Sequence, residues 1–159
     1  MVNEGIVGNR LLVDGDVFGV NLPWGIFGET FTKEGLLEET LHIGDRLRVG
    51  SAEFVVTQPR MPCFKLGIRF NRSDMVKRFL QSDRTGFYFA VRTEGEVAAG
   101  DSIELLERDE HNIAVADVVN LYRGDAANQD LLHRISELAS LPNSWREYFR
   151  KRLWKPDDR

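Results

Sequence analysis

The chain has 159 residues, of which 42% are hydrophobic and 29% charged, and its formal net charge is −4 at pH 7. This length favours one compact domain with a hydrophobic core, and the composition excludes a disordered or fibrous protein. The negative net charge gives no general attraction to nucleic acid, and no apolar run approaches the ~20 residues of a membrane span, so we expect neither as a partner.

The N-terminal part shows turn signals and little periodicity. Residues 10–13 have β character, Asp14-Gly15 is typical of a hairpin turn, and residues 17–20 continue the apolar pattern. Residues 1–5 lack the basic region and apolar stretch of a signal peptide, and one cysteine cannot form an internal disulfide. Both features favour the cytoplasm.

The pattern becomes clearly β from residue 41 onward. Residues 46–49 alternate with period two, Gly50-Ser51 predicts a tight turn, and residues 52–57 resume as a strand. Ser73 is expected to cap a short helix. Further strands are expected at 64–70, 84–91, around Val97, at 103–105 and at 113–115, followed by a short helix at 116–122. We therefore expect a mainly β domain over residues 1–122.

The remainder, residues 124–159, predicts a helical extension packed on this β domain. Asn128 is expected to cap a helix whose apolar residues share one face and which ends at Leu141-Pro142. Ser144 and Glu147 have the spacing of a capping box at the start of the last helix.

The segment from Thr57 to Leu66 contains the only cysteine, Cys63, between Arg60 and Lys65 and directly after Pro62. Nearby cations favour the thiolate, which is the nucleophilic and metal-binding form, and proline favours a strand end over a central strand. Cys63 is therefore the first candidate for a catalytic residue or a metal ligand. The alternative is a small buried hydrophobic residue.

Two other clusters carry polar groups in glycine-containing loops. Gly28-Glu29-Thr30 places an acid in a turn, and residues 84–88 place Arg84 and Tyr88 at the start of a predicted strand. The alternative for both is turn geometry alone. The chain has no P-loop, no G-x-S-x-G and no H-E-x-x-H, and its three histidines show no metal-ligand spacing.

Four blocks in this order resemble the MOSC domain, the molybdenum-cofactor sulfurase C-terminal domain, in its single-domain bacterial branch that includes the hydroxylaminopurine-resistance proteins. They are residues 27–36, 43–50, 57–66 and 84–88. The helical tail, with Ser144-Trp145 and residues 151–153, resembles the short C-terminal extension of that branch.

The resemblance implies a MOSC-type β-barrel with short helices and a C-terminal helical extension. It also implies a molybdenum cofactor (molybdopterin), with Cys63 as catalytic residue and metal ligand. The activity implied is reduction of N-hydroxylated bases or related N-oxygenated compounds, with electrons from a separate reductase. For binding the cofactor, whose phosphate is anionic, we expect the cations Arg60, Lys65 and Arg84 together with residues Glu29, Thr30 and Tyr88.

Two departures from the family pattern affect this expectation. Thr30 stands where the family has asparagine, and a His-Gly-Gly stretch that precedes the family's Gly-Glu block has no counterpart in residues 1–25. We therefore expect a β-barrel that is incomplete or completed by a partner chain. An open sheet edge recruits other chains, which predicts a homodimer or another homo-oligomer.

Two alternative functions follow from the same residues. In the first, the chain is expected to be a sulfur or cofactor carrier that acts with a pyridoxal-phosphate cysteine desulfurase, with Cys63 holding the sulfur. In the second, the chain is expected to be a non-catalytic binding or assembly module with a MOSC-like scaffold.

Overall fold

The described part of the protein forms one open six-stranded sheet. The structure, a computed structural model, describes residues 4–9, 26–33, 35–124 and 128–153. The strand order is β2-β1-β5-β4-β3-β6, in which β1 and β2 run parallel and all other neighbours antiparallel. The strands are β1 Glu4–Asn9, β2 Phe31–Lys33, β3 Arg46–Val49, β4 Ala52–Pro59, β5 Phe87–Thr93 and β6 Ile103–Glu107. Within the described residues the sheet does not close, and β2 and β6 are its edges.

The hairpin of β3 and β4 was predicted correctly from period-two alternation. Arg46 pairs with Val55 and Val49 with Ala52, and Gly50 in the turn has a φ of 57°. A positive φ is easy for glycine and strained for other residues, which is why this turn carries glycine. The alternation buries Leu47 and Val49 on the core side.

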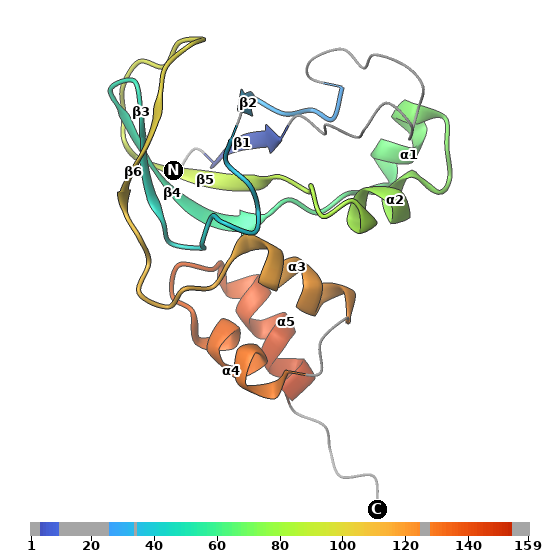
Figure 1. The fold of residues 1–159 in the computed structure, drawn as a ribbon. Coiled ribbons are helices and arrows are strands. Elements are labelled where there is room, and N and C mark those ends of the chain that lie inside the picture. The colour runs from blue at the N-terminus through green and yellow to red at the C-terminus, as the bar shows by residue number, and fades with distance from the viewer. Residues whose placement is uncertain (1–3, 10–25, 34, 125–127, 154–159) are drawn as a thin grey trace, which may run out of the picture.

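The described residues also form five short helices: α1 Phe64–Phe70, α2 Met75–Gln81, α3 Val115–Arg123, α4 Gln129–Glu137 and α5 Asn143–Leu153. Figure 1 shows α3, α4 and α5 grouped below the sheet, whereas α1 and α2 lie together beyond the end of β4. Asn128 caps α4 as predicted, because its side chain accepts a hydrogen bond from the Leu131 amide at 3.0 Å.

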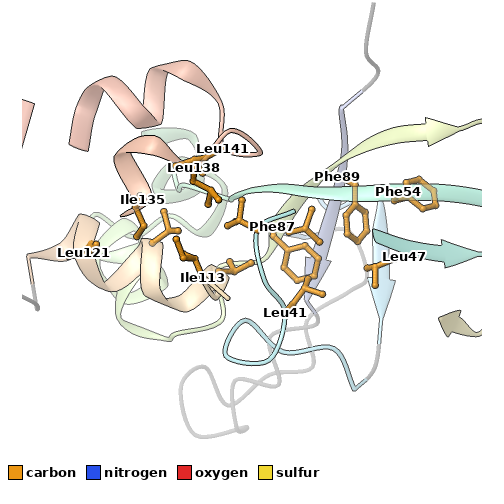
Figure 2. Packing of buried hydrophobic residues seen from close by; sticks show 14 of the residues in the cluster. Leu41, Leu47, Phe54, Phe87, Phe89, Ile113, Leu121, Ile135, Leu138 and Leu141 are labelled. Atoms are coloured by element: carbon orange, nitrogen blue, oxygen red, sulfur yellow. The ribbon is translucent and has the colours of Figure 1, made fainter. Parts of the chain in front are cut away.

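One hydrophobic core joins the sheet to the C-terminal helices. Phe54, Phe87 and Phe89 from the sheet belong to the same buried cluster as Ile135 of α4 and Phe149 of α5. Figure 2 shows the sheet and helix side chains meeting around Leu41, Phe87 and Ile113. The mostly β fold with a helical C-terminal extension is thus as predicted.

A second, smaller core lies under α1 and α2. It consists of Phe27, Leu66, Met75 and Phe79, and the rings of Phe27 and Phe79 lie 5.9 Å apart. It anchors the loop before β2 to the two helices.

The strand predicted at residues 64–70 is wrong, because this segment is helix α1. Helix α1 ends at Asn71, which has a φ of 50°, and the Asn71 amide bonds to carbonyls of the last turn. A short apolar run does not distinguish a strand from a buried helix turn, and here the packing of Leu66 into the second core decides.

Several other local predictions also fail. Residues 113–115 contribute only an isolated bridge between His42 and Ala114, and Val97 lies outside any strand. The residue that caps α2 is Asp74, one position after the predicted Ser73. The strand predicted at 84–91 begins at Phe87.

The predicted capping box at the last helix is also wrong. Helix α5 begins at Asn143, so Ser144 lies inside it, and Glu147 accepts a hydrogen bond from the Asn143 side chain at 2.6 Å. The strands predicted at 10–13 and 17–20 lie outside the described residues. Among the helices of the described ranges, none has the length and apolar character of a membrane span.

Candidate cofactor site

Cys63 lies in the short connection between β4 and α1. The strand ends at Pro59, and Cys63 is the last residue before the helix, with extended backbone angles of −117° and 171°. Its carbonyl accepts a hydrogen bond from the Leu66 amide at 3.0 Å. The thiol is exposed, which contradicts the alternative of a buried hydrophobic cysteine.

Arg60 is the partly buried cation of the site. Its Nη2 donates to the Phe27 carbonyl, and its guanidinium lies 5.4 Å from the centre of the Phe79 ring. Burial lowers the pKa of Arg60, whereas the charges of Tyr88, Glu29 and Cys63 raise it. Three other predicted site residues therefore lie within electrostatic range of Arg60, and the four residues come from three separate segments.

Gly28 and Glu29 approach Arg60 from the loop before β2. Gly28 has a φ of 78°, and a Cβ at this position would lie 4.0 Å from Nη2 of Arg60. The Glu29 carboxylate accepts a hydrogen bond from the Phe27 amide at 3.1 Å, which shapes this turn. The loop thus brings the Glu29 carboxylate and the Phe27 carbonyl to the side of the guanidinium.

Arg84 belongs to a separate ion-pair cluster. Its Nη1 donates to Glu39 at 2.7 Å and lies 3.5 Å from the Glu38 carboxylate, which is 1% exposed. Glu38 also accepts a hydrogen bond from the Gly86 amide at 2.8 Å. The Gly86 carbonyl in turn accepts from the Arg60 amide at 3.0 Å, so one residue joins the Arg84 cluster to the Arg60 cluster.

Lys65 and Thr30 make no side-chain hydrogen bond or ion pair with the described residues of the Arg60 cluster or the Arg84 cluster. Both are exposed, Lys65 on α1 and Thr30 in the loop before β2, and neither side chain has a hydrogen bond or ion pair in the part of the chain that the structure describes. Their predicted part in cofactor binding stays a prediction.

Lys33, at the end of β2, was missed by the sequence reasoning. It is 9% exposed, its Nζ has no hydrogen-bond partner among the described residues, and this atom lies 4.8 Å from the centre of the Phe87 ring. Desolvation by burial lowers the pKa of Lys33 to about 8, against the charge of Glu38, which raises it. No sequence signal marks it, because lysine in a short strand is ordinarily exposed.

These groups fit an anionic metal cofactor. The described residues contain no group of three histidine, cysteine or acidic side chains that could hold a metal ion alone, so the cofactor would supply the remaining ligands. An exposed soft thiol suits a transition metal, and Arg60 with the unpartnered amine of Lys33 supplies positive charge for an anion.

Comparison with known proteins identifies the family. The family model of the MOSC domain matches residues 8–104, more than half of the chain, and that of the YiiM-like, 3-alpha helix domain matches residues 113–155. The chain therefore belongs to the MOSC domain family. The second match includes α3, α4 and α5.

Two sequence relatives and one solved structure are similar to most of this chain. It is 43% identical over 126 residues to the uncharacterized protein YflK of Bacillus subtilis, covering 79% of this chain and 57% of YflK. The crystal structure of YiiM from Geobacillus stearothermophilus superimposes with a TM-score of 0.87 at 32% identity, covering 94% of this chain and 77% of that one. A Gibberella moniliformis protein named Reductase is 32% identical over 115 residues, which are 72% of this chain and 20% of that protein. The chain thus spans little more than half the length of YflK.

Proposed function

We propose that the protein binds the molybdenum cofactor and acts as an oxidoreductase on N-hydroxylated bases or related N-oxygenated compounds. The observation that carries this proposal is the exposed thiol of Cys63 within electrostatic range of the partly buried Arg60. Membership of the MOSC family and the relative named Reductase support it. The predicted cytoplasmic location agrees with a single reduced thiol.

In this proposal the Cys63 thiolate is the protein ligand to the metal. The bound cofactor would supply the chemistry that removes an oxygen atom. The substrate's N–O bond breaks, and two electrons and two protons convert the hydroxylamine to an amine and water. The electrons come from a separate reductase, and the protein's share is to orient the cofactor through Arg60, Glu29 and Tyr88.

Metal analysis tests the proposal directly. Protein made in a host that synthesises the molybdenum cofactor is expected to carry molybdenum and pterin, and Cys63→Ala and Cys63→Ser are expected to lose most of the molybdenum. Because Cys63 is exposed, neither change should alter folding, which circular dichroism checks. Equal molybdenum in wild type and both variants, or none in any of them, would overturn the proposal.

The exposure of Cys63 also favours a second candidate function, a sulfur carrier that acts with a cysteine desulfurase. In that case the thiolate takes a sulfur atom from the desulfurase persulfide and becomes a persulfide itself, while the donor cysteine regains its thiolate. Mass spectrometry of protein incubated with a desulfurase and cysteine would then show one added sulfur on Cys63 without bound molybdenum.

A further inference from the structure

We infer that helix α1 carries the docking surface for an acidic electron-carrier protein. The surface, which we call the α1 patch, consists of the exposed apolar side chains of Phe64 and Ile68 and of the cations beside them. The inference rests on the proposed function, in which electrons come from a separate protein, and it names the surface that this donor binds.

The first observation is the exposure of two large apolar side chains on α1. Phe64 and Ile68 are each 71% exposed, more than any other large apolar residue of the described ranges. Residues four apart lie side by side on a helix, so the two form one surface. Leu66 of the same helix is buried in the second core. Large apolar side chains that stand together in solvent often mark an interaction site.

The second observation is the charge around these two residues. Helices α1 and α2, with the turn between them, carry five cations and one carboxylate, whereas the whole chain has a net charge of −4. The carboxylate, Asp74, pairs with Arg72 and Arg78. The three remaining cations are exposed, and the part of the chain that the structure describes offers them no ion pair: Lys65, Arg69 and Lys77.

This charge selects the kind of occupant. The cations attract an acidic surface, and they oppose a second copy of this chain that presents the same patch, because like charges would then face each other. An apolar centre with a charged rim is the usual anatomy of a protein interface, and weak redox encounters have the smallest interfaces. A membrane surface is disfavoured, since two apolar side chains bury little area in a lipid interface.

The α1 patch adjoins the candidate cofactor site. Phe64 follows Cys63 directly in the chain, and both side chains are exposed. Arg69 lies within electrostatic range of Arg60, whose pKa its charge lowers. A carrier on the patch would therefore stand next to the thiol that holds the metal in the proposed function. Two reduced carriers that dock in turn, each losing one electron, supply the two electrons that cleavage of the N–O bond consumes.

Binding of purified carriers to the full chain tests the inference by isothermal titration calorimetry. The probes are a flavodoxin and a ferredoxin, which are small acidic carriers, and cytochrome c serves as the basic control. The wild type should bind an acidic carrier, but not cytochrome c, at an ionic strength of about 0.01 M. Binding should weaken toward about 0.15 M, because the Debye length falls from about 30 Å to about 8 Å.

Two variants probe the two parts of the patch. Arg69→Glu reverses a charge of the rim and Phe64→Ala truncates the apolar centre, and each should weaken carrier binding by about tenfold or more. Both residues are exposed, so folding should be retained, which circular dichroism checks.

Two matched controls should bind as the wild type. Arg92→Glu makes the same change of charge at an exposed position near the end of β5 that lies away from α1. Tyr148→Ala truncates an exposed aromatic residue of α5.

Three results would overturn the inference. The first is that neither acidic carrier binds the wild type at low ionic strength, and the second is that Arg69→Glu and Phe64→Ala bind as the wild type does. The third is binding of phosphatidylglycerol vesicles, but of neither carrier, that Phe64→Ala abolishes, because the patch would then belong to a membrane surface.

Failure of this inference is distinguishable from failure of the proposed function. Carrier binding that requires Arg69 and Phe64, in a protein that never carries molybdenum, supports the docking surface while the proposed function fails. Molybdenum that Cys63→Ala loses, in a protein that binds neither carrier, supports the proposed function and refutes the docking surface.

Discussion

Lys33 is a buried cation and Arg60 a half-buried one, and the two differ in their hydrogen bonds. Arg60 donates to the Phe27 carbonyl and lies over the Phe79 ring, whereas Lys33 contacts the Phe87 ring and has no hydrogen-bond acceptor in the part of the chain that the structure describes. The sequence predicted Arg60 because it lies three residues before Cys63, between Pro59 and Pro62. It did not predict Lys33, because burial of a strand lysine depends on segments that are distant in the chain.

Lys33 should make the stability of the ligand-free protein depend on pH. Burial lowers its pKa from 10.5 to about 8, so the protonated amine destabilises the fold below pH 8, and stability rises between these values because the unfolded chain binds more protons. Lys33→Met should therefore raise the free energy of unfolding at pH 7 by about 2 kcal/mol.

Urea unfolding in phosphate-free buffer at pH 7 and pH 9.5 measures this difference. The gap between variant and wild type should shrink by more than half at the higher pH, where the folded wild type has released the proton. Lys77→Met, at an exposed position, should change stability little at either pH. A gap that stays constant between the two pH values would contradict the assigned cause.

At the level of elements, predictions from local pattern succeeded where one signal dominates. Alternation and a glycine turn predicted β3 and β4, and an asparagine cap predicted the start of α4. Helix α1 was missed because its identity depends on Leu66 packing against residues of other segments. For the same reason the sequence indicated the candidate residues of the site one by one, but it did not indicate that Gly86 connects two clusters.

Asp45 holds the start of β3 to the loop that leads into α3. This fully buried carboxylate accepts hydrogen bonds from the His42 and Asp109 amides, both at 2.9 Å, and lies 3.5 Å from Arg108. Asp45→Asn places an amide donor where an acceptor is needed and should reduce the free energy of unfolding by about 2–4 kcal/mol.

Chemical denaturation of Asp45→Asn beside Asp130→Asn checks this expectation. Asp130 is 82% exposed in the first turn of α4, so its substitution should have an effect of no more than about 0.5 kcal/mol. Equal stability of the two variants would show that the Asp45 hydrogen bonds do not connect these elements.

At the scale of the whole molecule, the unpaired edges of the open sheet are the surfaces where the predicted homodimer is expected to form. Of the two edges in the described residues, β6 is the longer, with five residues against three in β2, and Leu105 within it is 43% exposed. An unpaired edge with an exposed apolar residue favours pairing with a second copy.

Light scattering at micromolar concentration should therefore give twice the mass of the 18.2 kDa chain. Leu105→Lys should yield the monomer, because a charged residue on an edge strand opposes pairing. Leu37→Lys, at a position that is 39% exposed and outside the sheet, should leave the dimer intact. A wild type with the mass of a single chain would refute the prediction.

The exposed position of Cys63 also makes the protein convenient for spectroscopy. Cys63 is the chain's one cysteine, so a maleimide dye or a nitroxide spin label would attach at one defined atom without removal of other thiols. A label there would sit at the junction of β4 and α1. It would block the thiol while reporting on the mobility of that junction.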